Sequence, residues 1–533
     1  MKNIRKALII VLAAIMSLCS FSACGGGRSA EGKLFISVEN KGYGVPWVRK
    51  LAKAFENKTG VEVTVEQSTF EAETTSLQGD SNDHDIIFVC GELSYYATDG
   101  RLTNLYELFY NQVPYGADAT ATKIKDLCAF TDCYNMKSEG DNVYSYYAFP
   151  YANGTEALLY NATTLNAIYG SSWKLPKTSN EFFAMLEDIF TNKSDKAYGM
   201  TSIGSYTESF VNTWWAQYDG YEKYFDYWRA YKDGEFCSAS PEMAKNLGRL
   251  RALEALEKLF SRYDKSETES KLKYFHDKIT DFVVGSTPGM AQASSDTFAG
   301  ASYKKDTRLV AFMPNGDWFE YEMDKEVLEG QDIRMMKIPV LSEITETFEG
   351  ADKNMSDATL SACIAKIDGD TLSTAEEALI AGVSETTFER IREARNMVYS
   401  LGCLQQGAVP ATSVNKELAA EFLRFMVSDE GQKIYSTELG GLSMCYGYSP
   451  DSSINITEYV KSVNAVNKDA KFIYRDISHA ICYRGGLAWF TINSNNYTTV
   501  MILGSKSAQD VYNYTYNDLS ARWETIKKDS GLK

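Results

Sequence analysis

The chain has 533 residues, too many for a single hydrophobic core, so we expect two domains or lobes. Its composition of 44% hydrophobic and 23% charged residues is that of a globular protein and excludes wholesale disorder. The net charge of −17 argues against nucleic acid or an anionic membrane surface as the main partner.

The first residues of the chain have the pattern of an export signal. Basic side chains precede an apolar run over residues 7–16 that is too short to span a bilayer comfortably. The segment then ends in Phe21-Ser22-Ala23-Cys24, which resembles the lipobox of bacterial lipoproteins. This resemblance implies that residues 1–23 are a signal peptide and that Cys24 is lipidated. Residues 24–32 would then be a glycine-rich tether between a membrane anchor and an extracytoplasmic body.

Alternation of strands and helices begins directly after this tether. Residues 34–38 form an apolar run that predicts a strand, and residues 61–65 alternate valine with polar residues at the period of a second strand. Between them Val48, Leu51 and Phe55 recur at helical spacing, which predicts a helix. A strand, helix and strand in this order make a βαβ unit, so we expect a parallel sheet. Residues 85–90 are a further buried strand.

Ligands of such sheets collect beyond the carboxyl ends of the strands. Glu39 and Tyr43 follow the first predicted strand, and Glu92 and Tyr95 follow the strand over 85–90. Their positions make them candidate ligand contacts. Trp47 stands close behind Tyr43, and the alternative for it is packing of its helix against the sheet.

The stretch over residues 147–161 has the pattern of a segment that crosses from one lobe to another. Pro150 holds Phe149 out of the α region, and Gly154 interrupts the run before an apolar strand resumes. Tyr151, Asn153 and Gly154 would face a cleft between the lobes. The alternative is an ordinary edge strand with a bulge at Gly154.

Ten cysteines and three histidines give little support for metal or redox chemistry. The histidines show no ligand spacing, and no CxxC pair occurs outside the leader, so we predict no metal site and no cofactor. Cys128 and Cys133 could form a disulfide, whereas Cys90, Cys363 and Cys403 lie in apolar runs and are expected to be buried thiols.

Several motifs resemble one family in one order. They are the strands over 34–65 and 85–88, Phe149-Pro150-Tyr151 with Leu159-Tyr160-Asn161, Leu175-Pro176-Lys177-Thr178, residues 312–318, and residues 407–431. The family is the extracellular solute-binding proteins of the sugar type, the maltodextrin-binding-like group that serves ABC importers. Residues 366–400 and the tail after residue 443 depart from its pattern.

The resemblance implies an α/β fold of two lobes, each a mainly parallel sheet flanked by helices, with ligand in the cleft between them. Residues 33–149 with 340–436 would form lobe one, and residues 150–339 with 437–533 lobe two, with crossings near Phe149, Pro339 and Tyr435. It further implies a non-enzymatic monomer that passes a carbohydrate to the membrane permease of an ABC importer.

A sugar offers hydroxyl groups and flat C–H faces, so its site needs carboxylates or amides together with aromatic rings. Under the resemblance, Glu92 corresponds to a carboxylate that accepts hydrogen bonds from the sugar, and Trp318 to a tryptophan that stacks on it, with Asp317 beside it. Of the helical neighbours Trp214 and Trp215, at most one can reach a ligand, and we select Trp215.

Two alternatives stay open. The same fold could bind a polyamine, which would suit Glu39, Glu92 and Asp317. More remotely, Asp317, Glu320 and Glu322 could be the carboxylates of a secreted glycoside hydrolase. Ferric ion binding by the adjacent Tyr95 and Tyr96 is disfavoured, because neighbouring strand residues face opposite ways.

Overall fold

The computed structural model describes most of the chain beyond the leader. The described residues are 31–79, 82–130, 145–193, 195–200, 204–229, 231–232, 235–236, 245–259, 309–323, 325–475, 491–492, 495–496, 501 and 506–529. The signal peptide, Cys24, most of the predicted tether and Cys133 therefore lie outside the described residues. In the part of the chain that is described, no helix is long and apolar enough to cross a membrane.

The first sheet contains the predicted βαβ unit. β1 pairs in parallel with both β2 and β3, whereas β12 pairs antiparallel with β3 and with β4. The sheet has the order β2-β1-β3-β12-β4, with strands at Lys33–Glu39 (β1), Glu62–Ser68 (β2), Ile86–Cys90 (β3), Gln405–Ala408 (β12) and Phe149–Pro150 (β4). Its helical segments are α2 (Pro46–Thr59), α3 (Phe70–Gln78), α4 (Ser94–Thr98), the π-helical turn η1 (Tyr106–Tyr110), α5 (Ile124–Leu127), α19 (Lys416–Met426) and α20 (Asp429–Glu438).

Helix α2 shows how the sequence directs this local structure. Pro46 occupies the first helical turn, where its missing N–H costs nothing, and Gly60 ends the helix in the left-handed conformation with φ of 80°. The predicted apolar residues of this helix are all buried, on one face against the sheet.

The second sheet is built around β5 (Thr155–Asn161), all seven residues of which are buried. Its order is β13-β11-β5-β9-β6, and β10 pairs with β5 beside β11; the strands are β6 (Ala197–Met200), β9 (Leu309–Gly316), β10 (Ile333–Met336), β11 (Met397–Ser400) and β13 (Lys471–Ile473). The helices on this side are α6 (Ala162–Tyr169), α7 (Ser179–Asn192), α8 (Glu208–Asp219), α9 (Tyr221–Arg229), α11 (Leu247–Leu259), α14 (Phe319–Glu322), α15 (Lys325–Leu328), α16 (Asp357–Asp368), α17 (Thr374–Ile380), α18 (Glu385–Asn396), α21 (Glu458–Asn467) and α24 (Ala508–Asp529). Short 3₁₀ turns are η3 (Gly204–Thr207), η4 (Ser342–Thr347) and η5 (Gly350–Asp352), and two small ribbons pair β7 (Tyr231–Lys232) with β8 (Glu235–Phe236) and β14 (Thr491–Ile492) with β15 (Asn495–Asn496).

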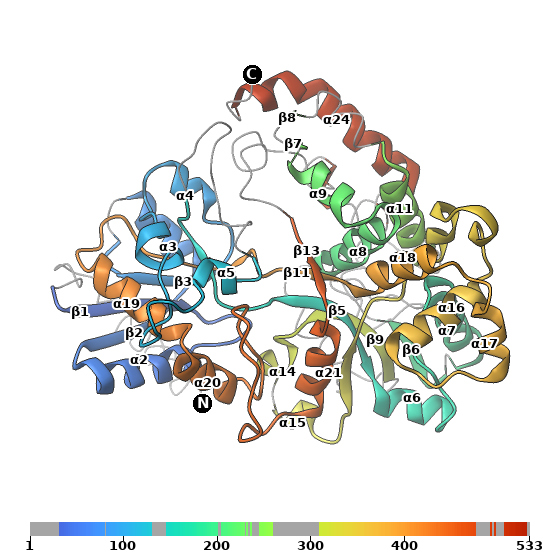
Figure 1. The fold of residues 1–533 in the computed structure, drawn as a ribbon, viewed down its shortest axis with the longest axis horizontal. Helices are drawn as coiled ribbons and strands as arrows, with labels where there is room; N and C mark the ends of the chain where they lie inside the picture. The colour runs from blue at the N-terminus through green and yellow to red at the C-terminus, as the bar shows by residue number, and fades with distance from the viewer. Residues whose placement is uncertain are drawn as a thin grey trace, which may run out of the picture.

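Figure 1 shows the first sheet with its helices on the left and the second on the right, with α24 arching across the top. The two sheets and their flanking helices confirm the predicted α/β class of a two-lobe solute-binding fold. The expectation that each sheet is mainly parallel is wrong, because β12 runs against β3 and β4 in the first sheet and β5 runs against β9, β10 and β11 in the second.

The chain passes between the two sheets in three places, which we call the first, second and third passages. The first passage, residues 151–154, joins β4 to β5, close to the expected crossing at Phe149. The second, residues 401–404, joins β11 to β12, and the third, residues 439–457, joins α20 to α21. We expected the second near Pro339, but β10 and β11, on either side of that residue, both belong to the second sheet. The segment between them stays on that side and builds a separate small core with α16, α17 and α18.

Candidate functional site

Side chains from the ends of several strands meet where the two lobes touch. Tyr43 lies in the loop after β1, and Asp317 and Trp318 follow β9 of the other sheet. The Tyr43 hydroxyl donates a hydrogen bond to Asp317 Oδ1, and its ring meets the Trp318 ring edge-on at 6.3 Å between centroids. The ring of Tyr151, in the first passage, has its centroid 6.3 Å from that of Tyr43 and stacks on the Trp47 ring with 5.5 Å between centroids. We call these five residues the interlobe cluster.

Asp317 is the electrostatic centre of this cluster. Its second carboxylate oxygen accepts the backbone N–H of Thr155 at 3.1 Å, at the start of β5. Burial raises the pKa of Asp317 to about 6, against the opposing effect of the hydrogen bonds from Tyr43 and Thr155. Burial and the nearby Asp317 charge also raise the pKa of Tyr43, which keeps its hydroxyl a donor at neutral pH.

Trp318 is held in place by two glycines and a tyrosine. A Cβ on Gly316 would come within 2.2 Å of its indole ring, so the ring lies directly on that backbone. From the other lobe, Gly42 approaches the Trp318 side chain closely enough that an added Cβ would contact it at 3.6 Å. The Tyr206 ring tilts over the indole at 6.2 Å, and its hydroxyl accepts the indole N–H at 3.4 Å. Trp318 is consequently only 4% exposed.

Further hydrogen bonds join the lobes beside this cluster. The Gly42 backbone N–H donates to Glu322 Oε1 at 3.1 Å, and the Tyr321 hydroxyl donates to the Leu439 carbonyl at 2.5 Å. Burial raises the pKa of Glu322, and the hydrogen bond from Gly42 opposes the shift. Sequence reasoning missed Tyr206 and Tyr321 as site residues, because neither occupies the end of a predicted strand.

Other predicted site residues lie outside the cluster. The Glu39 carboxylate accepts the backbone N–H of Cys90 at 2.7 Å and so joins β1 to the end of β3. Glu92 accepts a hydrogen bond from the Ser94 hydroxyl at the start of α4. On the same helix Tyr95 is 59% exposed.

The last three predicted site residues make contacts inside the second lobe or between the passages. Trp215 is fully buried in the second lobe, where its indole N–H donates to Asp219 Oδ2 at 2.6 Å. Asn153 donates to the Ser443 carbonyl at 3.2 Å and thereby joins the first passage to the third. Gly154, with φ of 58°, packs directly on Gly402 of the second passage.

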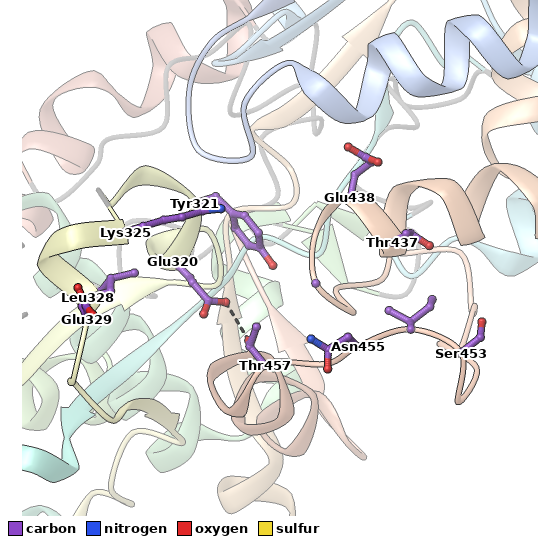
Figure 2. A pocket seen from close by; sticks show the side chains of 12 residues that line it. Glu320, Tyr321, Lys325, Leu328, Glu329, Thr437, Glu438, Ser453, Asn455 and Thr457 are labelled. Atoms are coloured by element: carbon purple, nitrogen blue, oxygen red, sulfur yellow. Dashed lines mark hydrogen bonds between the residues drawn. The ribbon is translucent and has the colours of Figure 1, made fainter.

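A groove opens directly beyond the interlobe cluster, and we call it the interlobe groove. One wall comes from α14 and α15, which follow Trp318 in the chain, and the other comes from the end of α20 and the third passage (Figure 2). Its volume is about 960 Å³. Figure 2 shows Glu320 turned toward Thr457, whose hydroxyl donates to it at 2.9 Å. The lining residues are Glu320, Tyr321, Lys325, Leu328, Glu329, Thr437, Glu438, Gly440, Ser453, Ile454, Asn455 and Thr457.

The groups that line the interlobe groove suit the binding of a polar solute. Among the residues that the structure describes, no three histidine, cysteine or acidic side chains gather in a way that could hold a metal ion. Of the carboxylates considered for a hydrolase, Asp317 is 2% exposed and fully engaged by protein donors. The groove instead offers an aromatic face, carboxylates, hydroxyls and an amide, which are groups that hold a polar solute.

The comparison with known proteins agrees with this geometry. The model of a family described as bacterial extracellular solute-binding protein matches residues 50–348, which is more than half of the 533 residues. The matched part runs from within α2 to just past η4, and it includes Tyr151, Asp317 and Trp318 of the interlobe cluster, whereas Tyr43 and Trp47 precede it. A search of curated proteins gave no match.

Proposed function

The chain belongs to the bacterial extracellular solute-binding proteins, and on this premise we propose that it captures a sugar between its two lobes. The solute would be an oligosaccharide of the kind bound by the maltodextrin-binding-like group. The protein would deliver it unaltered to the permease of an ABC importer, acting as a monomer.

The observation that carries the proposal is the interlobe groove, whose walls come from both lobes. Its volume of about 960 Å³ is at the upper end of the range for small-ligand sites, roughly 300–1,000 Å³. A solute that contacts α14 on one side and the end of α20 on the other stabilises the closed arrangement, because only the closed arrangement offers both contacts. Glu320 and Glu438 would accept hydrogen bonds from sugar hydroxyls, and Tyr321 would pack against a ring face.

The available groups suffice for a useful affinity. An aromatic side chain buries ~150–250 Å², so covering half of the Tyr321 ring is worth roughly 2–3 kcal/mol at ~25 cal/mol/Å². Each hydrogen bond to a carboxylate adds about 1.5–3 kcal/mol. One ring and two carboxylates therefore reach roughly 5–9 kcal/mol, against about 8 kcal/mol for micromolar binding.

Calorimetric titration with maltodextrins and xylo-oligosaccharides tests this proposal. Tyr321→Ala should weaken sugar binding roughly 30-fold or more, since every 1.4 kcal/mol is a factor of ten. Tyr115→Ala is the matched control, because Tyr115 is another partly buried tyrosine that does not line the groove. Tyr95→Ala tests the earlier assignment of Tyr95 to the site. Sugar binding that is unaffected by Tyr321→Ala but abolished by Tyr95→Ala would move the site to the end of β3.

A second candidate function, polyamine binding, is favoured by the charge of the groove lining. Glu320, Glu329 and Glu438 outnumber the one lining lysine, Lys325. Spermidine belongs in the same titration panel for this reason. Binding of spermidine without a signal from any sugar would replace the sugar proposal, and conversion of an oligosaccharide to products would show a glycoside hydrolase.

We also propose the lipid anchor that the lipobox-like segment implies, with residues 1–23 removed and Cys24 acylated. Expression of Cys24→Ser in a bacterial host tests it. The wild-type protein should fractionate with membranes and the variant should not. Equal membrane association of both would refute the anchor.

A further inference from the structure

Two cysteines from distant parts of the sequence meet beside α5 of the first lobe. Cys128 directly follows α5, and Cys445 lies in the third passage. Both side chains are buried, with exposures of 9% and 3%. The neighbouring Ala129 donates its backbone N–H to the carbonyl of Cys445 at 2.9 Å, so the two main chains run beside each other at this point.

This arrangement brings the two thiols together, as a disulfide requires. Disulfides span Cα distances of roughly 4.4–6.8 Å, so they need two main chains that run side by side, as these two do. The Cys128 and Cys445 thiols are in hydrogen-bond contact with each other. Burial and this contact with Cys128 raise the pKa of Cys445.

The pair lies close to where the third passage contacts the first. Next to Cys445, the Ser443 carbonyl accepts the hydrogen bond from Asn153 of the first passage at 3.2 Å. The Tyr446 hydroxyl donates to the Pro150 carbonyl at 2.8 Å, where the first passage begins. A covalent bond at Cys445 would therefore fix the third passage, together with the start of the first, to the body of the first lobe.

We propose that Cys128 and Cys445 form a disulfide in the exported protein. Each thiol loses its proton, the Cys128 Sγ–Cys445 Sγ bond forms, and the two electrons pass to a protein or small-molecule disulfide, which is reduced to two thiols. The extracytoplasmic compartment of the family permits this bond, because disulfides persist outside the reducing cytosol. The assignment depends on this compartment and on the contact between the thiols, and it is independent of which solute is bound.

Sequence spacing alone left the disulfide partner of Cys128 open. Cys128 and Cys133 are close in sequence, but Cys133 lies outside the described residues, whereas Cys445 is in contact with Cys128. The other buried cysteines provide controls. Cys363 belongs to the separate core with α16, and Cys403 is 1% exposed in the second passage.

Peptide mapping by mass spectrometry under non-reducing conditions tests the proposal on the exported full-length chain. A peptide pair joined through Cys128 and Cys445 should be lighter than its two parts by two hydrogen atoms and should separate on reduction. Cys128→Ser should release Cys445 for alkylation under denaturing conditions, and Cys445→Ser should release Cys128. Cys363→Ser should leave the linked pair unchanged.

A second experiment applies if the expression host does not oxidise the pair. The wild-type chain is reduced, unfolded and refolded with glutathione disulfide, and the same linked peptide should then appear. A Cys128–Cys133 link in the exported protein would overturn the proposal. Complete alkylation of both Cys128 and Cys445 after export and after oxidative refolding would overturn it as well.

Discussion

Substitution of Gly154 by alanine tests how closely the first two passages are packed. Gly154 has φ of 58°, a left-handed conformation that disfavours a side chain. An added Cβ would lie 2.5 Å from the backbone nitrogen of Gly402 and 2.7 Å from the carbonyl carbon of Leu401. The Leu401 N–H also donates to the Gly154 carbonyl at 2.7 Å, so the two passages cannot separate without breaking this bond.

The expected loss of stability has two parts. The left-handed conformation costs an alanine roughly 1–2 kcal/mol. Overpacking a site whose neighbours cannot move aside costs typically 1–3 kcal/mol more. Together they predict that Gly154→Ala lowers the free energy of unfolding by about 2–5 kcal/mol.

Gly60→Ala is the control that separates these parts. Gly60 caps α2 with φ of 80°, and an added Cβ there would meet nothing within 4 Å. It should therefore show only the conformational cost of roughly 1–2 kcal/mol. Urea denaturation of both variants and the wild type gives the comparison. If Gly154→Ala destabilises the protein no more than Gly60→Ala, the tight contact between the passages is refuted.

Three further predictions concern buried charges. Burial holds the pKa of Asp317 at about 6, above its ordinary 3.8, so its charged form destabilises the fold by about 3 kcal/mol above pH 6, and this penalty disappears as the pH falls toward 4. When the pH is lowered from 7 to 5, the denaturation midpoint of the wild type should therefore rise relative to that of Asp317→Asn. Parallel pH curves for the two proteins would refute this. His84 Nδ1 lies 3.3 Å from the Glu73 carboxylate; burial alone would lower the pKa of His84, but Glu73 raises it above its ordinary value. The stability that the charged His84 gains from Glu73 is therefore fully present below pH ~6.5 and is lost as the pH rises through the folded-state pKa. His84→Gln should therefore abolish a loss of stability above about pH 6.5, which thermal denaturation across pH measures. Arg249, fully buried on α11, donates to the Tyr512 carbonyl of α24 at 2.8 Å, so Arg249→Ala should cost about 1.5–3 kcal/mol and expose α24 to limited proteolysis; an unchanged cleavage pattern would contradict this.

The sequence predicted best the parts of the fold that local chemistry determines. Pro46, Gly60 and the apolar face between them specify α2 within one stretch of chain, and valine alternation specifies β2 beside it. The second passage could not be located in this way. β10 and β11 are both short strands that pair with β5, so the chain leaves this sheet only after β11, and the residues of the two strands do not show this from their own pattern.

The candidate site shows the same division. Tyr43 follows a predicted strand and Tyr151 lies in a predicted crossing, whereas Asp317 is a candidate only through the family resemblance; the structure brings the three together. Trp215 could not be placed from its spacing, because every side of α8 is covered by another element and both tryptophans of this helix are buried. Tyr206 is 112 residues from Trp318 in sequence, and no periodicity connects them. The roles of all these residues in binding remain predictions.

The hydrogen bonds that join the lobes must affect every solute alike. The Gly42–Glu322 and Tyr321–Leu439 hydrogen bonds involve protein groups on both sides, so they stabilise closure whichever solute is present. A solute shifts the equilibrium between open and closed forms only through its own preference for the closed one.

Loss of one such bond changes the population of the binding-competent form by the same factor for all solutes. Glu322→Ala removes the acceptor for Gly42, and a typical hydrogen bond contributes about 0.5–1.5 kcal/mol, so each dissociation constant should rise about two- to twelvefold. Tyr321→Phe removes a hydrogen bond between the lobes but keeps the ring, and should give a similarly uniform effect. If Glu322→Ala instead weakens one solute strongly and leaves others unchanged, Glu322 contacts that solute directly, and the closure argument fails for this residue.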